Sequence, residues 1–446
     1  MNNKEIEIYF QEIGASFELT KKGMNSIIAA FHDEMKKGLS GGKSSLKMLP
    51  SFVNRPKGDE KGKFLALDLG GTNFRILEVK FDGRGGIKEE HVGKFVIPKA
   101  VMHGTSTQFF NFIAKAVQKF VLKNGIGFSE KRGLGFTFSF PLKQRSISSG
   151  ILINWTKGFS ASGVVGEDVV KLLSKSLKRY GLNNIEIVAL INDTVGTLAT
   201  RSYKDPNCDI GVIFGTGTNA CYTERVDKIA KLSESERRKA GKGMIINIEW
   251  GNFNKLTMNS FDKKLDQATN NPKKQLMEKM IAGMYLGELT RLVLTDMIAS
   301  KLLFAKENAI FSEGDFSTRH MSLIEADSSS GLSGIVSYLE GIGIINSTLF
   351  ERKCLKRVCR LVSTRAAGIC AAAISAVVMW MDPKISKSHT IAIDGTLFEK
   401  YPKFRERILS SFVELHGNKA KRIKLVQAHD GSGIGAATIA AVASSV

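Results

Sequence analysis

The sequence predicts an α/β protein in which one architecture occurs twice, with two or three lobes around a cleft. A glycine- and threonine-rich turn between two apolar runs appears at residues 64–75 and again at 210–222. Each turn leads into strand patterns and then into crossover helices, which is the order of an α/β fold. A chain of 446 residues also exceeds one compact core, so a cleft between lobes is the expected ligand site.

Apolar periodicity assigns the elements of the first half of the chain. Helical spacing of apolar residues predicts three helices, at residues 24–35, 109–120 and 167–179. Strands are expected where apolar residues alternate or run together, at residues 64–69, 77–81, 133–140 and 185–191. The stretch between 141 and 166 is expected to consist mainly of loops.

The second glycine turn begins a second copy of this pattern. Its two apolar runs predict a hairpin over residues 210–222, and helical patterns dominate in two long segments, 273–304 and 349–381. A short strand is predicted at 390–394. A last helix is expected to begin through Gly431-Ser432-Gly433-Ile434-Gly435.

The composition excludes several classes of protein. The five cysteines contain no Cys-x-x-Cys and the seven histidines do not cluster near them, which disfavours disulfide frameworks and zinc sites. The most apolar stretch, 366–381, is shorter than the roughly 20 residues that cross a bilayer, and we expect it to pack inside the protein. The charged N-terminus lacks a signal-peptide pattern, so we expect a cytoplasmic protein with reduced thiols.

The formal net charge of +21 is high for an enzyme that acts on small molecules. Such a charge can indicate a polyanionic partner, such as nucleic acid or an anionic membrane. The basic runs contain acidic residues in several cases and no interleaved aromatic residues; they lie at 36–47, 228–242, 352–360 and 403–424. We therefore expect a solvated basic surface that attracts anionic substrates, with no dedicated nucleic-acid partner and no membrane.

The two glycine turns are suited to gripping a phosphate chain from both sides. Glycines lack Cβ atoms, so backbone N–H groups can converge on an anion, with a threonine hydroxyl as an additional donor. Only the first turn contains Asp68, whose carboxylate could hold a nucleotide's Mg²⁺ through water. Either turn alone could be a plain hairpin. Neither has the spacing of a Walker motif or of a dinucleotide-binding fingerprint.

Candidate catalytic residues lie between the turns. Asp193 follows the buried strand 185–191, where an acid often faces a cleft, although it could instead cap the next helix. The segment 150–159 places Lys157 among aromatic residues and glycines, in a stretch too irregular for a packed element. This segment could hold a ligand, or it could be a tryptophan-anchored surface loop with a solvated lysine.

Further polar residues complete a possible site for a polyol. Glu249 and Glu278 each lie beside bulky apolar residues, although Glu278 could simply be a solvated helix residue; on a helix it would share a face with Lys274 and Tyr285. Carboxylates accept hydrogen bonds from vicinal hydroxyls, and side-chain amides both accept and donate them. The set comprises Thr156, Lys157, Asn192, Asp193, Asn219, Glu249 and Glu278. A phosphate grip beside a polyol site suggests phosphoryl transfer to a sugar hydroxyl.

At these residues the chain resembles the hexokinase family, including glucokinases of similar length, from Met48 to Val442. The matching motifs agree in order and spacing; they lie at 67–75, 134–168, 192–197, 215–222 and 430–433. The resemblance implies an actin-like ATPase fold, which is a duplicated ribonuclease H-like fold, with two lobes that close on glucose. It also implies a small lobe of residues 60–191 plus 434–446 and a large lobe of 1–59 plus 192–433.

The resemblance assigns a role to each candidate residue. Asp193 is the implied general base, and Lys157 is implied to stabilise the charge of the migrating phosphoryl group. The implied hexose contacts are Ser139, Thr156, Lys157, Asn192, Asp193, Asn219, Glu249 and Glu278. The implied nucleotide contacts are Asp68, Gly70, Gly71, Thr72, Asn73, Thr216, Thr318, Gly431 and Ser432, with Mg²⁺ near Asp68.

The implied activity is transfer of phosphate from ATP to the 6-hydroxyl of glucose, the first step of glycolysis. A kinase that prefers fructose or mannose is an alternative, because these hexoses share most of the contacted hydroxyls. A catalytically silent sugar sensor, or a regulator that binds a polyanion, is an alternative of another class. We expect a monomer or a homodimer.

Overall fold

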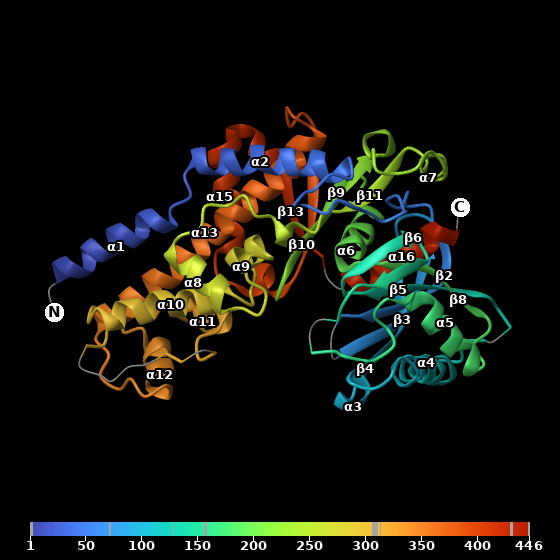
Figure 1. Ribbon diagram of the computed structural model, residues 1–446, viewed down its shortest axis with the longest axis horizontal. Helices are drawn as coiled ribbons and strands as arrows, with labels where there is room; N and C mark the ends of the chain where they lie inside the picture. Colours follow the sequence, from blue (N-terminus) through green and yellow to red (C-terminus); the bar gives the residue numbers. More distant parts are fainter. Residues whose placement is uncertain are drawn as a thin grey trace.

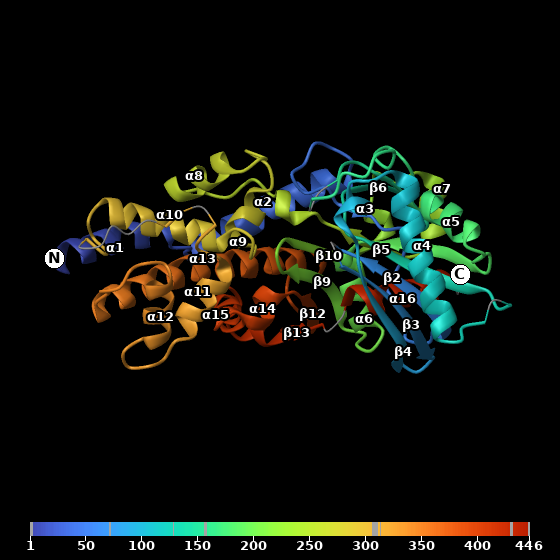
Figure 2. The same ribbon diagram turned by 90° about the horizontal axis from the view of Figure 1, so that it is seen from below.

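The computed structural model describes residues 3–70, 73–127, 129–155, 158–305, 311–312, 314–428 and 431–444. It contains a five-stranded and a six-stranded sheet, each within its own lobe (Figure 1). The six-stranded lobe also carries most of the helices, which extend away from the other lobe. Seen from below, the two lobes lie side by side along the long axis (Figure 2).

The five-stranded sheet has the order β4-β3-β2-β5-β8. Its strands are β2 (Lys61–Leu69), β3 (Asn73–Asp82), β4 (Ile87–Val96), β5 (Arg132–Phe138) and β8 (Ile185–Ile191). The first three form an antiparallel meander, and β5 and β8 then add in parallel to β2. Helices α4 (Ser106–Lys123) and α5 (Val169–Arg179) share one hydrophobic core with this sheet.

The six-stranded sheet repeats the same strand topology. Its strands are β1 (Leu49–Pro50), β9 (Cys208–Phe214), β10 (Thr218–Arg225), β11 (Gly243–Asn247), β12 (His389–Asp394) and β13 (Ile423–Gln427). Again three strands, β9 to β11, form an antiparallel meander, and β12 and β13 extend the sheet in parallel from β9. The predicted duplication of an α/β architecture is therefore confirmed.

The remaining elements surround these sheets. The helices are α1 (Asn3–Phe17), α2 (Lys21–Leu39), α3 (Lys99–Met102), α7 (Glu234–Ala240), α8 (Ser260–Ala268), α9 (Leu276–Ile281), α10 (Leu286–Ala299), α11 (Thr318–Ala326), α12 (Ser333–Gly341), α13 (Leu349–Met381), α14 (Thr396–Lys400) and α15 (Phe404–His416). A small hairpin comprises β6 (Leu142–Ser146) and β7 (Ser149–Leu152). Three short 3₁₀ helices are Val226–Lys228, Trp250–Asn252 and Gly417–Arg422.

Two helices, α6 (Asp193–Ser202) and α16 (Gly431–Ser444), join the lobes. They share a hydrophobic cluster with apolar residues of both sheets. Their backbones approach closely where glycine faces glycine, because a Cβ on Gly435 would overlap the Gly196 carbonyl. Only glycine allows this approach. Since α6 begins at Asp193, the packing of these helices fixes the position of the predicted base.

Most of the predicted elements are present, and three expectations need correction. The helix α1 was not predicted, although Ile6, Phe10 and Ile13 are buried on one face of it. The helical region 273–304 is interrupted, because Ala282 is extended and ends α9. The loop-rich stretch 141–166 contains the β6–β7 hairpin. The division into lobes at the stated boundaries remains a prediction.

The apolar stretch 366–381 packs inside the protein, as predicted. It forms the second half of α13, the one helix in the described chain that is long and apolar enough to cross a membrane. In that helix, 89 % of the most apolar window is buried, which is typical of a core helix. All five cysteines are buried and free, and no cluster of three or more metal-ligating side chains occurs among the described residues.

A buried histidine connects the six-stranded sheet to the end of α13. Nδ1 of His389 lies 2.7 Å from Oδ2 of Asp209, and its Nε2 lies 3.4 Å from Oδ2 of Asp382. Burial by itself lowers the pKa of His389, but the hydrogen bonds and charges of the two carboxylates outweigh it, and the pKa is raised. A raised pKa in the folded state stabilises the fold below the unfolded-state pKa of about 6.5. This stabilisation is lost as the pH rises through the folded-state value.

We therefore expect the effect of His389→Gln on stability to depend on pH. Near pH 6 the variant should lose roughly 1.5–3 kcal/mol of unfolding free energy, the contribution of hydrogen bonds to a charged group. The loss should shrink as the pH rises through the raised folded-state pKa of His389, above which the wild-type imidazole is neutral. Urea unfolding of both proteins across this range measures it. A loss that stays constant with pH would contradict a charged imidazole.

Candidate active site

The first glycine turn is tied to the start of α16. In β2, Oδ2 of the buried Asp68 accepts hydrogen bonds from Nη2 of Arg75 at 2.5 Å and from Oγ of Ser432 at 2.9 Å. The Arg75 guanidinium also donates to the Ser432 hydroxyl at 3.3 Å. These bonds bring together Asp68 and Ser432, which are 364 residues apart in the chain. Arg75, which was not predicted as a site residue, connects them.

The described neighbours of this turn also converge on it. Ser139 directly follows β5, and its N–H donates to the Leu69 carbonyl at 3.1 Å. A Cβ on Gly70 would lie 3.8 Å from the Ser139 hydroxyl. Asn73 is exposed at the start of β3. The predicted residues Gly71 and Thr72 lie outside the described residues.

The second glycine turn joins β9 to β10 and rests on the start of α10. The Gly283 N–H donates to the Gly215 carbonyl at 2.9 Å, and the Met284 N–H donates to the Thr216 carbonyl at 3.0 Å. One turn later, the Gly287 N–H donates to the Thr318 hydroxyl at 2.9 Å. The predicted nucleotide residues Thr216 and Thr318 thus lie on either side of the same short segment.

A polar cluster lies on the strands that follow this turn. Nδ2 of Asn219 donates to Oδ1 of Asn247 at 2.9 Å and to Oε1 of Glu249 at 3.0 Å. Nδ2 of Asn247 donates to the same Glu249 oxygen at 2.9 Å. Glu249 has a left-handed backbone with φ of 57°, a conformation that is costly for a residue with a Cβ and is common at binding sites. Asn247 was missed, although its position at the end of an apolar run before Glu249 was a usable signal.

Glu278 faces the second turn. Its Oε2 accepts a hydrogen bond from the Thr218 N–H at 3.0 Å, and the residue is half-buried. The predicted helical face through Lys274 and Tyr285 is wrong, because Gln275 is left-handed and Ala282 is extended. The short helix α9 instead presents the Glu278 carboxylate to the β9–β10 turn.

A buried ion pair holds the segment that carries Glu278. Nζ of Lys279 lies 2.7 Å from Oδ1 of Asp266, and only 3 % of the lysine side chain is exposed. Both oxygens of Asp266 also accept from the Lys273 N–H, at 3.0 and 2.9 Å. The Asp266 carboxylate therefore fixes both the loop before α9 and Lys279, the residue that follows Glu278.

The start of α6 holds Asn192 and Asp193. Asn192 is the N-cap, because its Oδ1 accepts from the Thr194 N–H at 3.0 Å and from the Thr194 hydroxyl at 2.8 Å. Asp193 is the first residue of the helix and is half-buried. Its Oδ1 also lies 2.8 Å from the Thr194 N–H. The capping role that the sequence left open for Asp193 thus belongs mainly to Asn192.

Contacts on two sides hold α6 between β10 and the start of α16. Sγ of Cys221, in β10, lies 3.1 Å from the Thr194 carbonyl. On the other side, the Thr200 hydroxyl donates to the Gly431 carbonyl at 3.0 Å. Burial raises the pKa of the Cys221 thiol, which therefore stays protonated and unreactive.

Two aromatic residues of the segment 150–159, Trp155 and Phe159, pack against the five-stranded lobe. The indole N–H of Trp155 donates to the Ala161 carbonyl at 2.8 Å, and its ring stacks on Phe159 with centroids 5.5 Å apart. Phe138 and Phe140 contact the same indole. The described residues after β7, 153–155 and 158–159, form no helix or strand, as predicted, and the Trp155 indole anchors them. The predicted residues Thr156 and Lys157, which follow Trp155, lie outside the described residues.

The described candidates thus form three groups. Asp68, Gly70, Asn73, Ser139, Gly431 and Ser432 lie around the first turn, and Thr216, Asn219, Glu249, Glu278 and Thr318 lie around the second. Asn192 and Asp193 lie at the start of α6, which contacts elements of both groups. Asp394 ends β12 and Gly395 follows it, with φ of 123°, so close to the second turn that a Cβ there would overlap the Phe214 carbonyl.

Comparisons with known proteins agree with this arrangement. Two family models, both described as hexokinase, match residues 9–203 and 209–442. Hexokinase-2 of Oryza sativa subsp. japonica is 44% identical over 436 residues, which cover 94% of this chain and 87% of that protein. Hexokinase-2 of Rattus norvegicus is 40% identical over 440 residues, which cover 95% of this chain. The chain spans about half of that relative, because the match covers 47% of it.

Solved structures show the same fold. The structure of a hexokinase from Schistosoma mansoni complexed with glucose matches with a TM-score of 0.84 and 35% identity, and the match covers 99% of this chain and 100% of that one. The two-lobed architecture is the actin-like ATPase fold that the sequence predicted. From the family models and the relatives together, the chain belongs to the hexokinase family.

Proposed function

We propose that this protein is a hexokinase that transfers the γ-phosphoryl group of ATP to the 6-hydroxyl of glucose. The observation that carries the proposal is the position of Asp193. It begins a helix that is fixed on one side to the strand after the second glycine turn and on the other to Gly431. The next residue, Ser432, is bonded to Asp68 of the first turn. A carboxylate in this position can reach a hydroxyl beside a gripped phosphate chain.

Each group of residues has a role in this reaction. The Asn219, Asn247 and Glu249 cluster and Glu278 supply acceptors and donors for sugar hydroxyls. Asp193 orients the 6-hydroxyl, whose oxygen attacks the γ-phosphorus while the bond to the β–γ bridging oxygen breaks. The proton moves to Asp193 late, because the transition state is loose and the hydroxyl gains little acidity before it. Lys157 is the proposed cation for the phosphoryl charge.

The carboxylate of Asp68 is the kind of oxygen ligand that fits a nucleotide-bound Mg²⁺. Mg²⁺ is usually held by one or two carboxylates together with phosphates and waters, rather than by a cage of protein ligands. Asp68 offers one carboxylate whose Oδ2 is already bonded to Arg75 and Ser432, which fits contact through water. Mg²⁺ supplies charge neutralisation on the phosphates when bound. The hydrogen bonds from Arg75 and Ser432 hold the Asp68 carboxylate in one orientation.

Glucose is the proposed substrate because a relative with a closely similar fold is complexed with glucose. Fructose and mannose remain alternatives, since the contacted hydroxyls are largely shared. We also propose that the protein acts in the cytoplasm, in the first step of glycolysis, as a monomer or a homodimer. Cell fractionation tests the location, and size-exclusion chromatography tests the oligomeric state.

A coupled assay for the phosphorylated sugar and ADP tests the activity. Purified full-length protein should turn over glucose with ATP and Mg²⁺, with a higher kcat/KM for glucose than for fructose or mannose. A higher value for another hexose would reassign the substrate. No turnover on any hexose, with sugar still bound, would support the silent sensor instead.

Removing the proposed water-mediated contact between Asp68 and Mg²⁺ should raise the Mg²⁺ concentration that the reaction requires. In Asp68→Asn we expect the Mg²⁺ concentration that gives half-maximal activity to rise by about 10- to 100-fold, the usual range for residues that act on a metal through its own ligands. KM for glucose should change little, because the cluster of Asn219, Asn247 and Glu249 lies at the other turn. Mg²⁺ titration at saturating ATP measures this. An unchanged Mg²⁺ requirement would exclude Asp68 from the metal site.

A further inference from the structure

The outer face of the five-stranded lobe is strongly basic. Helices α4 and α5 lie side by side over the sheet (Figures 1 and 2), joined by the Gln118 side chain, which donates to the Tyr180 carbonyl at 2.7 Å. The apolar residues of both helices are buried toward the sheet, which leaves the opposite sides in solvent. Seven exposed cations, which we call the basic face, lie on these helices: Lys115, Lys119, Lys123, Lys171, Lys175, Lys178 and Arg179.

The two helices contribute no acidic residue to this face, because neither α4 nor α5 contains an Asp or Glu residue. The two carboxylates that directly precede α5 are Glu167 and Asp168, and Asp168 is used as the helix cap, where Oδ1 accepts from the Val170 N–H at 2.9 Å. This concentration of charge was not predicted from the sequence, because the two helices are separated by about 45 residues and each contributes only part of it.

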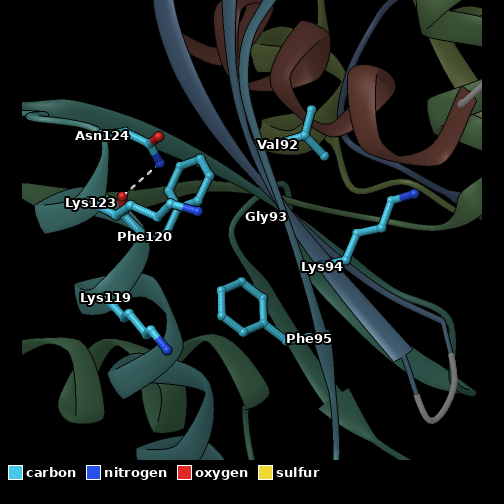
Figure 3. A pocket seen from close by; sticks show the side chains of 8 residues that line it. All are labelled: Val92, Gly93, Lys94, Phe95, Lys119, Phe120, Lys123 and Asn124. Atoms are coloured by element: carbon cyan, nitrogen blue, oxygen red, sulfur yellow. Dashed lines mark hydrogen bonds between the residues drawn. The ribbon is translucent and has the colours of Figure 1, made fainter.

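A pocket of about 250 Å³ adjoins the basic face, between α4 and the edge strand β4. Phe95 and Phe120 lie in it, and Lys119 and Lys123 extend from α4 beside them (Figure 3). A Cβ on Gly93 would lie 2.8 Å from the ring of Phe120, so this glycine lets the ring pack closely against β4. Leu122, next to Lys123, is 61 % exposed. Cations, an exposed leucine and an apolar pocket therefore occur together.

We propose that the basic face and this pocket dock the protein on the surface of an anionic phospholipid bilayer. Headgroup phosphates and carboxylates would neutralise the lysines, each of which contributes to attraction near such a surface. Leu122 and the phenylalanine-lined pocket would contact the less polar layer beneath the headgroups. Nucleic acid fits less well, because α4 and α5 carry no exposed aromatic ring for base stacking.

Docking in this orientation would leave the catalytic cleft free. The basic face covers one side of the five-stranded sheet, whereas α6 and α16, which carry Asp193 and Ser432, pack on its other side. Substitutions on the basic face should therefore leave kcat and the KM for glucose unchanged. This separation makes the proposal testable independently of the proposed function.

Sedimentation of the full-length protein with vesicles tests the proposal. At about 0.15 M salt, we expect binding to mixed phosphatidylserine and phosphatidylcholine vesicles and none to pure phosphatidylcholine. The triple variant Lys115→Glu, Lys119→Glu and Lys123→Glu should bind at least about tenfold more weakly. A matched triple variant on exposed lysines of the other lobe, Lys384→Glu, Lys419→Glu and Lys421→Glu, should bind like the wild type.

A single apolar substitution separates membrane docking from simple charge attraction. Leu122→Gln keeps every charge, so it should weaken vesicle binding and leave binding to heparin or duplex DNA unchanged. Equal losses in the two triple variants would show that only net charge acts and would overturn the proposal. Binding to duplex DNA without binding to anionic vesicles would overturn it in favour of a nucleic-acid partner. Unchanged kcat in each variant verifies that it is folded.

Discussion

Replacing Asp193 with alanine is expected to lower kcat by about a thousandfold or more. General base catalysis contributes about 10²- to 10⁴-fold, and Asp193 would also orient the attacking hydroxyl. A thousandfold loss corresponds to about 4 kcal/mol of transition-state stabilisation. The helix should remain intact, because Asn192 supplies the N-cap. Steady-state rates with ATP and glucose measure the effect.

The control for this variant is sugar binding. Asn219, Glu249 and Glu278 lie on other elements, so calorimetry should give a glucose Kd within a few-fold of that of the wild type. Asp193→Asn keeps the size and hydrogen-bonding capacity of the side chain but not its basicity, and we expect nearly the same loss of kcat. Near-normal turnover in either variant would exclude Asp193 as the base.

The largest expected effect on stability comes from Asp262→Ala. Oδ1 and Oδ2 of Asp262 in α8 accept from the two terminal nitrogens of Arg365 in α13, at 2.6 and 2.7 Å. Only 1 % of the aspartate side chain and 5 % of the arginine side chain are exposed. The variant would leave a buried guanidinium without its counter-charge, at a cost of about 3–5 kcal/mol. Denaturant unfolding measures this cost.

Two control variants separate this mechanism from the loss of any ion pair. Asp227→Ala removes the partner of Arg225 in an exposed pair with side chains 60 % and 70 % accessible, and it should cost less than about 1 kcal/mol. The double variant Asp262→Leu with Arg365→Met leaves no buried charge, so it should be considerably more stable than Asp262→Ala. Equal losses in the single and double variants would contradict the argument.

Several structural features followed from the sequence without knowledge of the fold. Turns at Gly70 and Gly215 between apolar runs predicted hairpins, because glycine permits the tight backbone and apolar runs must be buried. The strand 185–191 was located to the residue, since all but one of its residues are apolar and Asn192 caps the next helix. The duplication was visible because both copies keep the same order of patterns.

Local patterns failed where a distant contact decides the conformation. The helix α1 was not predicted. Its buried residue Phe10 lies against α13, where the Arg357 guanidinium is 4.1 Å from the centroid of the Phe10 ring. The break between α9 and α10 follows from hydrogen bonds of Gly283 and Met284 to the second turn. Tertiary contacts override the helical periodicity at such positions.

The sequence by itself determined the two glycine turns, the strand before Asp193 and the residue types of the site, because each depends on neighbours along the chain. Only the tertiary structure brought Ser432 to Asp68, Glu278 to the β9–β10 turn and Arg75 between the first turn and α16. It also gathered the lysines of α4 and α5 on one face. These pairings join residues far apart in the chain, and they depend on which faces the two sheets bury against α6, α16 and the outer helices. No local pattern encodes that choice.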